Sequence, residues 1–474
     1  MRTALTRAGR SIRPNPSTPP IRQVLADRRE LMSIGRTRAQ SPLTTIRHYA
    51  RTSPGKLVTI AMVLSIAILG TGWYASNVLE SRTDSLQNMI ERGEPLAEAS
   101  QVLYSSLSIA DAAANSAFIS GGLESPELRS RYSQALATAS AALMSAAGTS
   151  GGPAEGTTAA DRAVDADLKT LATTIPVYSG LIEVARTNNR LGNPVGSAYL
   201  SQASTLMQGQ ILPAAQRLYE RRSKAIADPQ QSLTSPPYGV YIALLAVALA
   251  LLATSRFLSR RTRRRFNIGV LAALVAIIGG LIWLLVSGLA SVAATNAAKT
   301  DGADPLRQLT EARILTQQAR SVETLSLVRR SDQTDLNETF ASATTAISTI
   351  MTSLGDQTRG DDRTLSAAQV KSVTSALDQW RSSDDATATA IERGDFARAR
   401  TLTIGTIPES TASSYASVDS ALTDAITTTR MSFRDDINTA QRVLGYTGNG
   451  ILVLAIFAAV ALVLGFIPRV REYR

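Results

Sequence analysis

The sequence predicts an all-α integral membrane protein with four transmembrane helices and two extracytoplasmic antiparallel four-helix bundles that form an internal repeat. Three observations lead to this prediction. Four segments each hold 18 or more mostly apolar residues without a charge, enough to cross ~30 Å of hydrocarbon. Basic residues gather in the short segments beside these stretches. The long segments between them repeat apolar residues every three or four positions, which is the helical period.

The four predicted spans fix the organisation of the chain. The first span is not a cleaved signal peptide, because a 56-residue preamble precedes it and no clear small-residue cleavage site follows. The predicted segments are a basic, mostly disordered tail 1–56 with an amphipathic helix at 20–34, span 57–79, bundle 80–237, span 238–255, basic connector 256–265, span 266–291, bundle 292–443, span 444–467 and tail 468–474.

The distribution of charge predicts the orientation. The two tails and the connector together carry 21 Lys and Arg against three acidic residues. The two long segments carry the remaining 28 basic and 35 acidic residues. Since short cytoplasmic segments are enriched in Lys and Arg, both termini are expected in the cytoplasm of a multi-pass cell-membrane protein. The net charge of +11 therefore reflects topology and attraction to anionic lipid, and does not indicate nucleic-acid binding.

Two parts of the chain, residues 57–255 and 266–467, share a layout and are called the first and second halves below. Pro95-Leu96 and Pro305-Leu306 each open a long helical pattern, and Gly-rich breaks follow at 148–156 and 355–363. An offset of about 210 residues relates these features, which indicates a duplicated span–ectodomain–span unit. Chance resemblance between Ala/Ser/Thr-rich helices is the alternative.

Each ectodomain is expected to hold four long helices, the first and last continuous with the spans. In the first, apolar stripes predict helices over 95–120, from Ser125-Pro126 onward, and over about 157–190 and 195–230. The turns far from the membrane are then 120–126 and 190–194. In the second ectodomain they fall near 330–334 and 393–396.

No enzyme signature is present, and we expect no catalytic residue, metal site or cofactor. The chain has no cysteine and one histidine, His48, which lies in the Pro- and Arg-rich tail. It has no phosphate-binding glycine loop, HExxH or GxSxG pattern. The spans carry no ionisable side chain, which argues against an ion pump or a proton-coupled transporter.

Four polar residues within the helices are candidates for ligand or partner binding. Asp111 and Asn115 are four apart and share a helix face. The plainer interpretation, which we favour, is a hydrogen bond between helices or exposure on the outer face. Arg320 and Glu323 are three apart, so an exposed ion pair within the helix is the favoured interpretation. Arg320 stays a candidate because a guanidinium suits a carboxylate ligand.

Two further segments are candidate docking sites. Gly121 and Leu123 lie in the first distal turn, where a partner could dock, although ordinary turn chemistry explains such residues too. In the N-terminal tail, the pattern over 20–34 is a basic amphipathic helix, suited to the membrane surface or to a groove in a partner. Its apolar stripe includes Ile21, Val24, Leu25 and Leu31, and Arg28 and Arg29 lie largely off it. The lone Trp380 is expected in a bundle core rather than in a ligand site.

Three stretches carry a resemblance to a known family. They are LYSSLSIADAAANSAFISGG (103–122), LRSRYSQALATAS (128–140) and ARSVETLSLVRR (319–330). The chain resembles the actinobacterial GlnX-type four-span membrane signalling proteins, and more broadly the four-helix-bundle sensor domains of chemoreceptors. The resemblance implies a relay between a glutamine-type amino-acid-binding lipoprotein outside and a soluble Ser/Thr protein kinase of the G type inside.

The sequence therefore predicts a non-enzymatic transmembrane signal relay that responds to extracytoplasmic amino acids and signals by helix movement. Its expected partners are membrane lipid, the lipoprotein and the kinase, with a homodimer also allowed and no nucleic acid. An envelope scaffold or assembly factor, or a transporter accessory subunit, is the alternative.

Overall fold

The computed structural model describes residues 53–119, 124–148, 158–262, 267–329, 334–358, 365–405 and 407–471. All regular secondary structure in these ranges is helical, which confirms the all-α prediction. The chain divides into two compact units, which we describe separately. Unit 1 comprises residues 1–70, 246–277 and 455–474, and unit 2 comprises 71–245 and 278–454.

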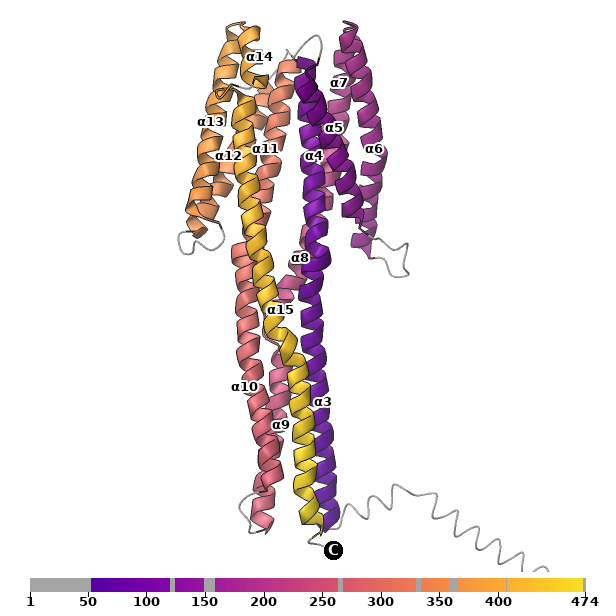
Figure 1. The fold of residues 1–474 in the computed structure, drawn as a ribbon, viewed down its shortest axis with the longest axis vertical. Helices are drawn as coiled ribbons and strands as arrows, with labels where there is room; N and C mark the ends of the chain where they lie inside the picture. The colour runs from indigo at the N-terminus through magenta and orange to yellow at the C-terminus, as the bar shows by residue number, and fades with distance from the viewer. Residues whose placement is uncertain are drawn as a thin grey trace, which may run out of the picture. The chain divides into compact units, whose positions relative to one another are not determined.

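The α-helices are labelled in Figure 1, and three short π-helical turns, written η, interrupt the helical runs. In chain order they are α3 (Ser53–Asn88), η1 (Met89–Gly93), α4 (Glu94–Ile119), α5 (Pro126–Ala147), α6 (Ala159–Arg190), α7 (Val195–Leu206), η2 (Met207–Ile211), α8 (Leu212–Leu233), α9 (Tyr238–Thr262), α10 (Ile268–Ala297), η3 (Ala298–Ala303), α11 (Asp304–Arg329), α12 (Thr334–Thr358), α13 (Ala367–Glu392), α14 (Phe396–Ile404) and α15 (Thr411–Arg471).

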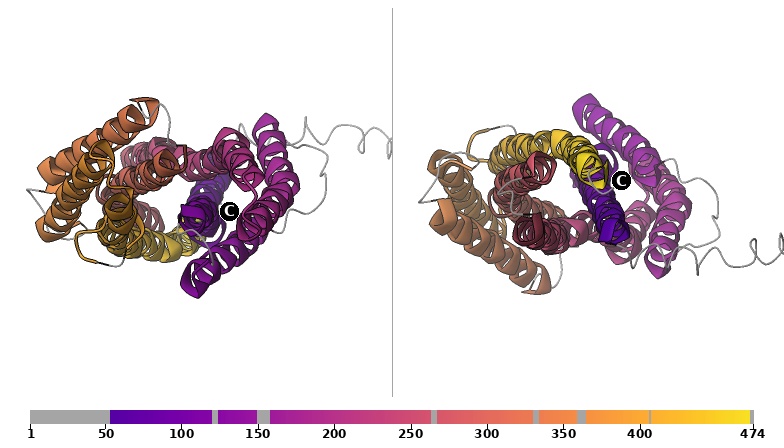
Figure 2. Two further views of the ribbon diagram at one scale, coloured as in Figure 1. Left: turned by 90° about the horizontal axis from the view of Figure 1, so that it is seen from above. Right: turned by 90° about the horizontal axis from the view of Figure 1, so that it is seen from below.

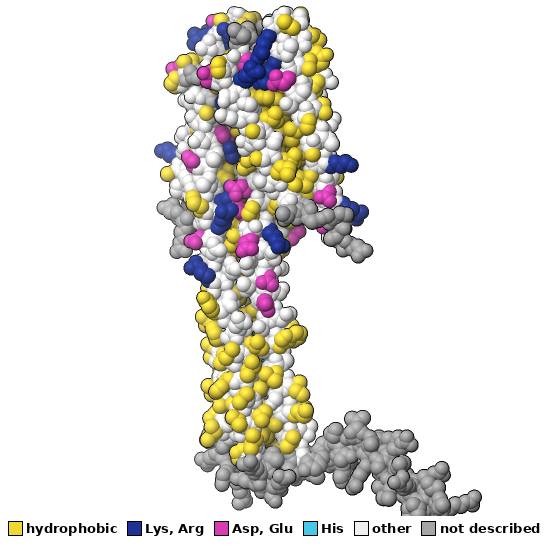
Figure 3. Space-filling view, turned by 45° about the vertical axis from the view of Figure 1, so that its right-hand side comes forward, with side chains coloured by type: hydrophobic (Ala, Val, Ile, Leu, Met, Phe, Trp, Pro, Cys, Tyr) yellow, Lys and Arg dark blue, Asp and Glu magenta, His cyan; other side chains and the backbone are white. Residues whose placement is uncertain are grey.

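Four helical stretches are long and apolar enough to cross a membrane: Leu57–Ile119, Val195–Arg260, Ile268–Ser326 and Thr411–Pro468. Their apolar parts expose large hydrophobic side chains such as Val275 and Val453, and Figure 3 shows such side chains in yellow. Water would penalise so much exposed apolar surface, whereas lipid accepts it. The length and composition are those of a membrane protein with four spans, as the sequence predicts.

One predicted continuity is wrong. The fourth helix of the first ectodomain does not run without a break into the second span, because α8 ends at Leu233 and α9 begins at Tyr238. Pro236 and Pro237 lie in the gap. A proline has no N–H for the helical ladder and disfavours helical geometry in the residue before it, so two in succession stop the helix.

Within unit 1, α10 and α15 approach closely at two glycines. A Cβ added to Gly269 would lie 2.4 Å from the Cα atom of Gly465. Asn267 fixes this contact: its Nδ2 donates to the carbonyl oxygen of Gly465 at 3.0 Å, and its Oδ1 accepts from the Gly269 N–H at 3.1 Å. Small residues at a helix crossing allow this close backbone packing in lipid.

Unit 2 contains two large hydrophobic clusters. The first is formed by α4, α5, α6 and the run α7–η2–α8, with Ile314 of α11 added at its edge. The second is formed by α11, α12, α13 and α15. Trp380 is fully buried in the second cluster, as predicted, and packs edge-on against Phe340 at 5.2 Å and Tyr415 at 5.6 Å between ring centroids.

α4 and α11 contact each other between these clusters (Figures 1 and 2). Gln317 donates to the Ser105 hydroxyl at 2.6 Å, and Gln318 donates to the Tyr104 hydroxyl at 3.1 Å. The two halves of the chain are therefore joined by buried polar contacts as well as by apolar packing.

A second connection between the halves runs from α15 to the start of α4. The Arg430 guanidinium lies 2.8 Å from the buried carboxylate of Glu94 and 2.9 Å from that of Glu98, and it donates to Gln101 at 2.9 Å. Arg434 pairs with the same two carboxylates. Because Glu94 is 2% exposed, its charge depends on these two arginines for stabilisation.

The three π-helical turns share one local feature. Each is followed directly by a residue and then a proline: Pro95 after η1, Pro213 after η2 and Pro305 after η3. A proline ring collides with the carbonyl group four residues earlier, and in all three cases that carbonyl lies inside the π-helical turn. The wider turn relieves this collision while the helix continues.

Candidate functional site

A buried carboxylate forms the centre of a polar cluster in the first half. Asp111 is 1% exposed, and its two carboxylate oxygens accept hydrogen bonds from four side chains of α4, α6, α7 and η2. The donors are Tyr178 (3.2 Å), Ser204 (3.3 Å), Gln208 (3.3 Å) and Asn115 (3.4 Å). These bonds join three helical runs of the first cluster across its core.

Burial dominates the electrostatics of this carboxylate. It raises the pKa of Asp111 to about 6, and the hydrogen bonds from Tyr178 and the other donors oppose the shift only in part. No cation within the described residues forms an ion pair with Asp111. We therefore expect this buried carboxyl group to change its protonation state around pH 6.

Asp111 and Asn115 share a helix face, as predicted, and both are buried and bonded to side chains of other helices. Of the two plainer interpretations, the structure therefore agrees with a hydrogen bond between helices and not with exposure on the outer face. A role for either residue in ligand or partner binding stays a prediction. Tyr178, Ser204 and Gln208 were missed because they lie 67, 93 and 97 residues from Asp111. The sequence contains one local signal for Gln208. This residue lies in the π-helical turn η2, which precedes Pro213.

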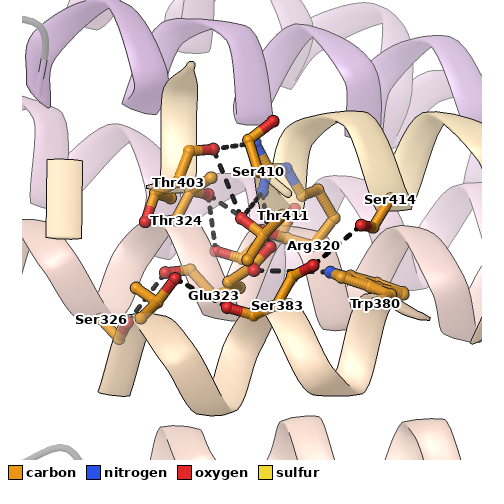
Figure 4. Close-up of polar contacts among 12 residues, drawn as sticks. Arg320, Glu323, Thr324, Ser326, Trp380, Ser383, Thr403, Ser410, Thr411 and Ser414 are labelled. Carbon is orange, nitrogen blue, oxygen red and sulfur yellow. Dashed lines mark hydrogen bonds and ion pairs between the residues drawn. The ribbon is translucent and has the colours of Figure 1, made fainter. Parts of the chain in front are cut away.

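The second polar cluster surrounds Arg320 and Glu323 on α11 (Figure 4). The Arg320 Nη1 atom lies 2.5 Å from the Glu323 carboxylate and donates to the Thr411 hydroxyl at 3.0 Å. The Nη2 atom donates to the Thr403 carbonyl oxygen at 3.0 Å. The indole N–H of Trp380 points to the other Glu323 oxygen at 3.4 Å.

This ion pair lies within one helix, as predicted, but the expectation that it is exposed is wrong. Arg320 is 5% exposed and Glu323 is 4% exposed. Residues of α13, α14 and α15 cover this face of α11, which the spacing of two residues on one helix cannot indicate. The pair is held by contacts from elements up to 91 residues away.

Two cavities flank the pair. The first, here called the acidic cavity, has a volume of about 470 Å³ and is lined by Glu323, Phe340, Arg381, Asp384 and Asp385 among others. Burial raises the pKa of Asp384 to about 7, with further contributions from the negative charges of Glu323 and Asp385. The second, here called the inter-half cavity, has a volume of about 540 Å³ and is lined on one side by Arg320 and Tyr415.

The remaining predicted residues lie outside the described residues. Gly121 and Leu123 belong to the first distal turn, and the amphipathic segment comprises Ile21, Val24, Leu25, Arg28, Arg29 and Leu31. At the edge of that turn, Ser125 caps α5 by accepting from the Leu128 N–H at 3.3 Å, and Glu124 pairs with Arg186 at 3.0 Å. Among the described residues, no group of three or more His, Asp or Glu could hold a metal ion.

Comparison with known proteins adds one finding. Residues 85–231 match the family model of the actinobacterial sensor domain, and these residues include η1, α4, α5, α6, α7, η2 and most of α8. The match covers roughly a third of the chain and contains the whole Asp111 cluster. No curated protein and no solved structure matches the chain. The similarity indicates a sensing role in an actinobacterial protein.

Proposed function

We propose that this protein is a non-enzymatic transmembrane signal relay of the GlnX type. It senses extracytoplasmic amino acids through a solute-binding lipoprotein and passes the signal to a cytoplasmic Ser/Thr protein kinase. The observation that carries the proposal is the sensor-domain match at 85–231, which lies between the first two predicted spans.

The proposed topology places the sensing regions outside the cell and the segments that would contact the kinase inside it. The two hydrophobic clusters of unit 2 would be two extracytoplasmic bundles related by duplication, and both termini would be cytoplasmic. The repeated sequence of π-helical turn, acidic residue, Pro and Leu at η1 and η3, about 210 residues apart, supports the duplication. The excess of Lys and Arg in the tails and connector supports the orientation.

The contacts between the halves suggest how a signal would pass. Arg430 and Arg434 of α15 tie the second half to Glu94 at the start of α4, and Gln317 of α11 ties it to Ser105. If a partner shifted α4, these bonds would either break or move α15 and α11 with α4. Movement of the first half would therefore move the second half as well. The tail segment 20–34 would then bind the kinase or the inner membrane surface.

A direct test is affinity purification of the solubilised protein from its own cells, with and without aspartate, asparagine and glutamine outside. The relay predicts recovery of a binding lipoprotein and a Ser/Thr kinase, with the recovered amount depending on the amino acid. Deleting residues 1–40 should remove the kinase from the purified material and leave the lipoprotein.

Unchanged recovery of the same partners in every condition, or recovery of wall-assembly proteins alone, would instead favour an envelope scaffold. Recovery of a permease with its ATPase would favour an accessory subunit of a transporter.

A further inference from the structure

We propose that the inter-half cavity binds a small organic carboxylate directly, so that the chain holds a ligand site of its own. The proposal deepens the proposed sensing function and rests on it only for its biological meaning. The cavity has a volume of about 540 Å³, within the range of ~300–1,000 Å³ typical of small-molecule sites.

Both halves of the chain contribute to the walls of this cavity. The first half supplies Ser116 of α4 and Glu127 and Arg131 of α5, and the second half supplies Arg320 of α11 and Tyr415 of α15. The apolar part of the wall includes Ile109, Ala112, Ala113, Leu128 and Ile404. A ligand bound here would contact both halves at once. If its contacts differ between two relative positions of the halves, its binding favours one of those positions.

Tyr415 supplies a hydroxyl to the wall of the cavity. Its ring packs on Trp380, and the Arg320 guanidinium lies over that ring at 5.6 Å from its centroid. The hydroxyl makes no hydrogen bond to the described residues, so it can donate to an acceptor in the cavity.

Two guanidinium groups provide further donors. Arg131 is exposed and forms no ion pair with the described residues, including Glu127 four positions earlier, whose carboxylate accepts from the Ser125 hydroxyl at 2.8 Å. Arg320 uses three of its five N–H groups on Glu323, Thr411 and Thr403, and its Nε–H and second Nη2–H form no hydrogen bond to the described residues.

The chemistry of this wall fits a carboxylate. A planar guanidinium binds a carboxylate through two parallel hydrogen bonds, and the Tyr415 hydroxyl adds a third donor. Since the Arg320 charge is already neutralised by Glu323, the positive charge available to a ligand comes from Arg131. The carboxylate of Glu127 on the same wall would suit an α-ammonium group, so amino acids are the members of this class that match best.

The test is calorimetric titration of the purified full-length protein in lipid nanodiscs, with no partner protein present. The probes are L-glutamine, L-aspartate, succinate and acetate. At least one should bind, and Arg131→Ala and Tyr415→Phe should each weaken its binding ~10-fold or more, as expected for loss of a hydrogen bond to a charged group. Arg129→Ala, an exposed change two residues from Arg131 and outside the cavity wall, should leave binding unchanged.

The same titration distinguishes the sources of the carboxylate. Binding of amino acids that Glu127→Gln weakens would assign an amino acid ligand, and preference for succinate would assign a dicarboxylate. Absence of binding of every probe up to ~10 mM by folded protein, or binding that both Arg131→Ala and Tyr415→Phe leave intact, would overturn the proposal. Neither result would affect a relay that acts through the lipoprotein, which the purification experiment tests separately.

Discussion

Two buried carboxylates in this protein are stabilised in different ways. Glu323 is paired with a buried arginine, whereas Asp111 receives only hydrogen bonds from neutral side chains. Removing a charge from water is costly, and a partner of opposite sign offsets more of that cost than neutral donors do. Asp111 therefore retains a raised pKa of about 6, which makes it a site of pH sensitivity in the sensor-like segment.

Replacing Asp111 by Asn should remove part of the pH dependence of stability. The pKa of Asp111 is raised in the folded protein, so the folded state binds an extra proton between about pH 4 and 6. Its contribution to stability is complete below pH 4 and is lost as pH rises through about 6, a change of up to ~3 kcal/mol. Thermal unfolding between pH 4 and 7.5, a range spanning ~2 units around this pKa, should show a flatter pH profile for Asp111→Asn.

Asp165→Asn is the matched control, because Asp165 is exposed on α6 of the same cluster. Asp384 also has a raised pKa, of about 7, so its ionisation likewise lowers the stability of the folded protein as pH rises. Since Asp384 is present in both proteins, their difference isolates Asp111. An identical pH slope in Asp111→Asn and wild type would contradict the assignment.

At the residue scale, the sequence predicted neighbours on a single helix and little else. The spacing of Asp111 and Asn115, and of Arg320 and Glu323, indicated correctly that each pair shares a face. Burial depends on which other helix covers that face, and the covering residues Tyr178 and Thr403 are 67 and 83 residues away in the chain. Helical periodicity contains no information about such distant partners.

At the scale of elements, two of the three π-helical turns, η1 and η3, place a glycine where a neighbouring helix approaches. A Cβ on Gly302, in η3, would lie 2.9 Å from the Cβ atom and 3.1 Å from the Cα atom of Phe433 on α15. A Cβ on Gly93, in η1, would lie 2.9 Å from a side-chain carbon of Ile226 on α8. The clash at Gly302 includes backbone, so a side-chain movement cannot relieve it fully.

Gly302→Ala should therefore destabilise the protein by ~1–3 kcal/mol through overpacking against α15. Gly180→Ala is the matched control, because Gly180 lies within α6 and an added Cβ there meets nothing within 4 Å. That change should stabilise by ~0.5–1 kcal/mol, since alanine favours a helix over glycine. Thermal unfolding followed by circular dichroism measures both, and equal effects of the two substitutions would refute the close contact.

Helix ends were more predictable than helix irregularities. Ser125-Pro126 correctly indicated the start of α5, and the Gly-rich break correctly indicated its end, where Gly148 has a φ of 65°. The π-helical turns before Pro95, Pro213 and Pro305 were not predicted. A proline alone does not produce a π-helical turn, because Pro176 lies within α6 and no such turn precedes it.

At the scale of the whole molecule, the sequence predicts the orientation in the membrane directly from the distribution of Lys and Arg. Introduced cysteine residues can test that orientation. The chain has no cysteine, so a single introduced thiol is the only labelling site. Ser145→Cys and Ser382→Cys, at exposed positions of α5 and α13, should react with a membrane-impermeant maleimide on intact cells. Ser259→Cys, in the basic connector, should react only after permeabilisation. The reverse pattern would invert the topology.

The contacts between the two halves lay beyond prediction at this scale. Sequence periodicity indicated two sets of four helices, but the pairs Arg430–Glu94 and Gln317–Ser105 join residues 336 and 212 positions apart. Either pair consists of residue types that are common on helix surfaces. Only the packing of α4 against α11 and α15 distinguishes them from exposed side chains.

The aromatic stack of Phe340, Trp380 and Tyr415 has a spectroscopic consequence. The chain has three tryptophans, and Trp73 and Trp283 lie in predicted spans with 67% and 42% of their surfaces exposed. Trp380 is fully buried, contacts the ring of Tyr415 and donates toward Glu323. With Trp73 and Trp283 replaced by Phe, its fluorescence would report movement of either neighbour, so the protein contains a native optical probe between its two cavities.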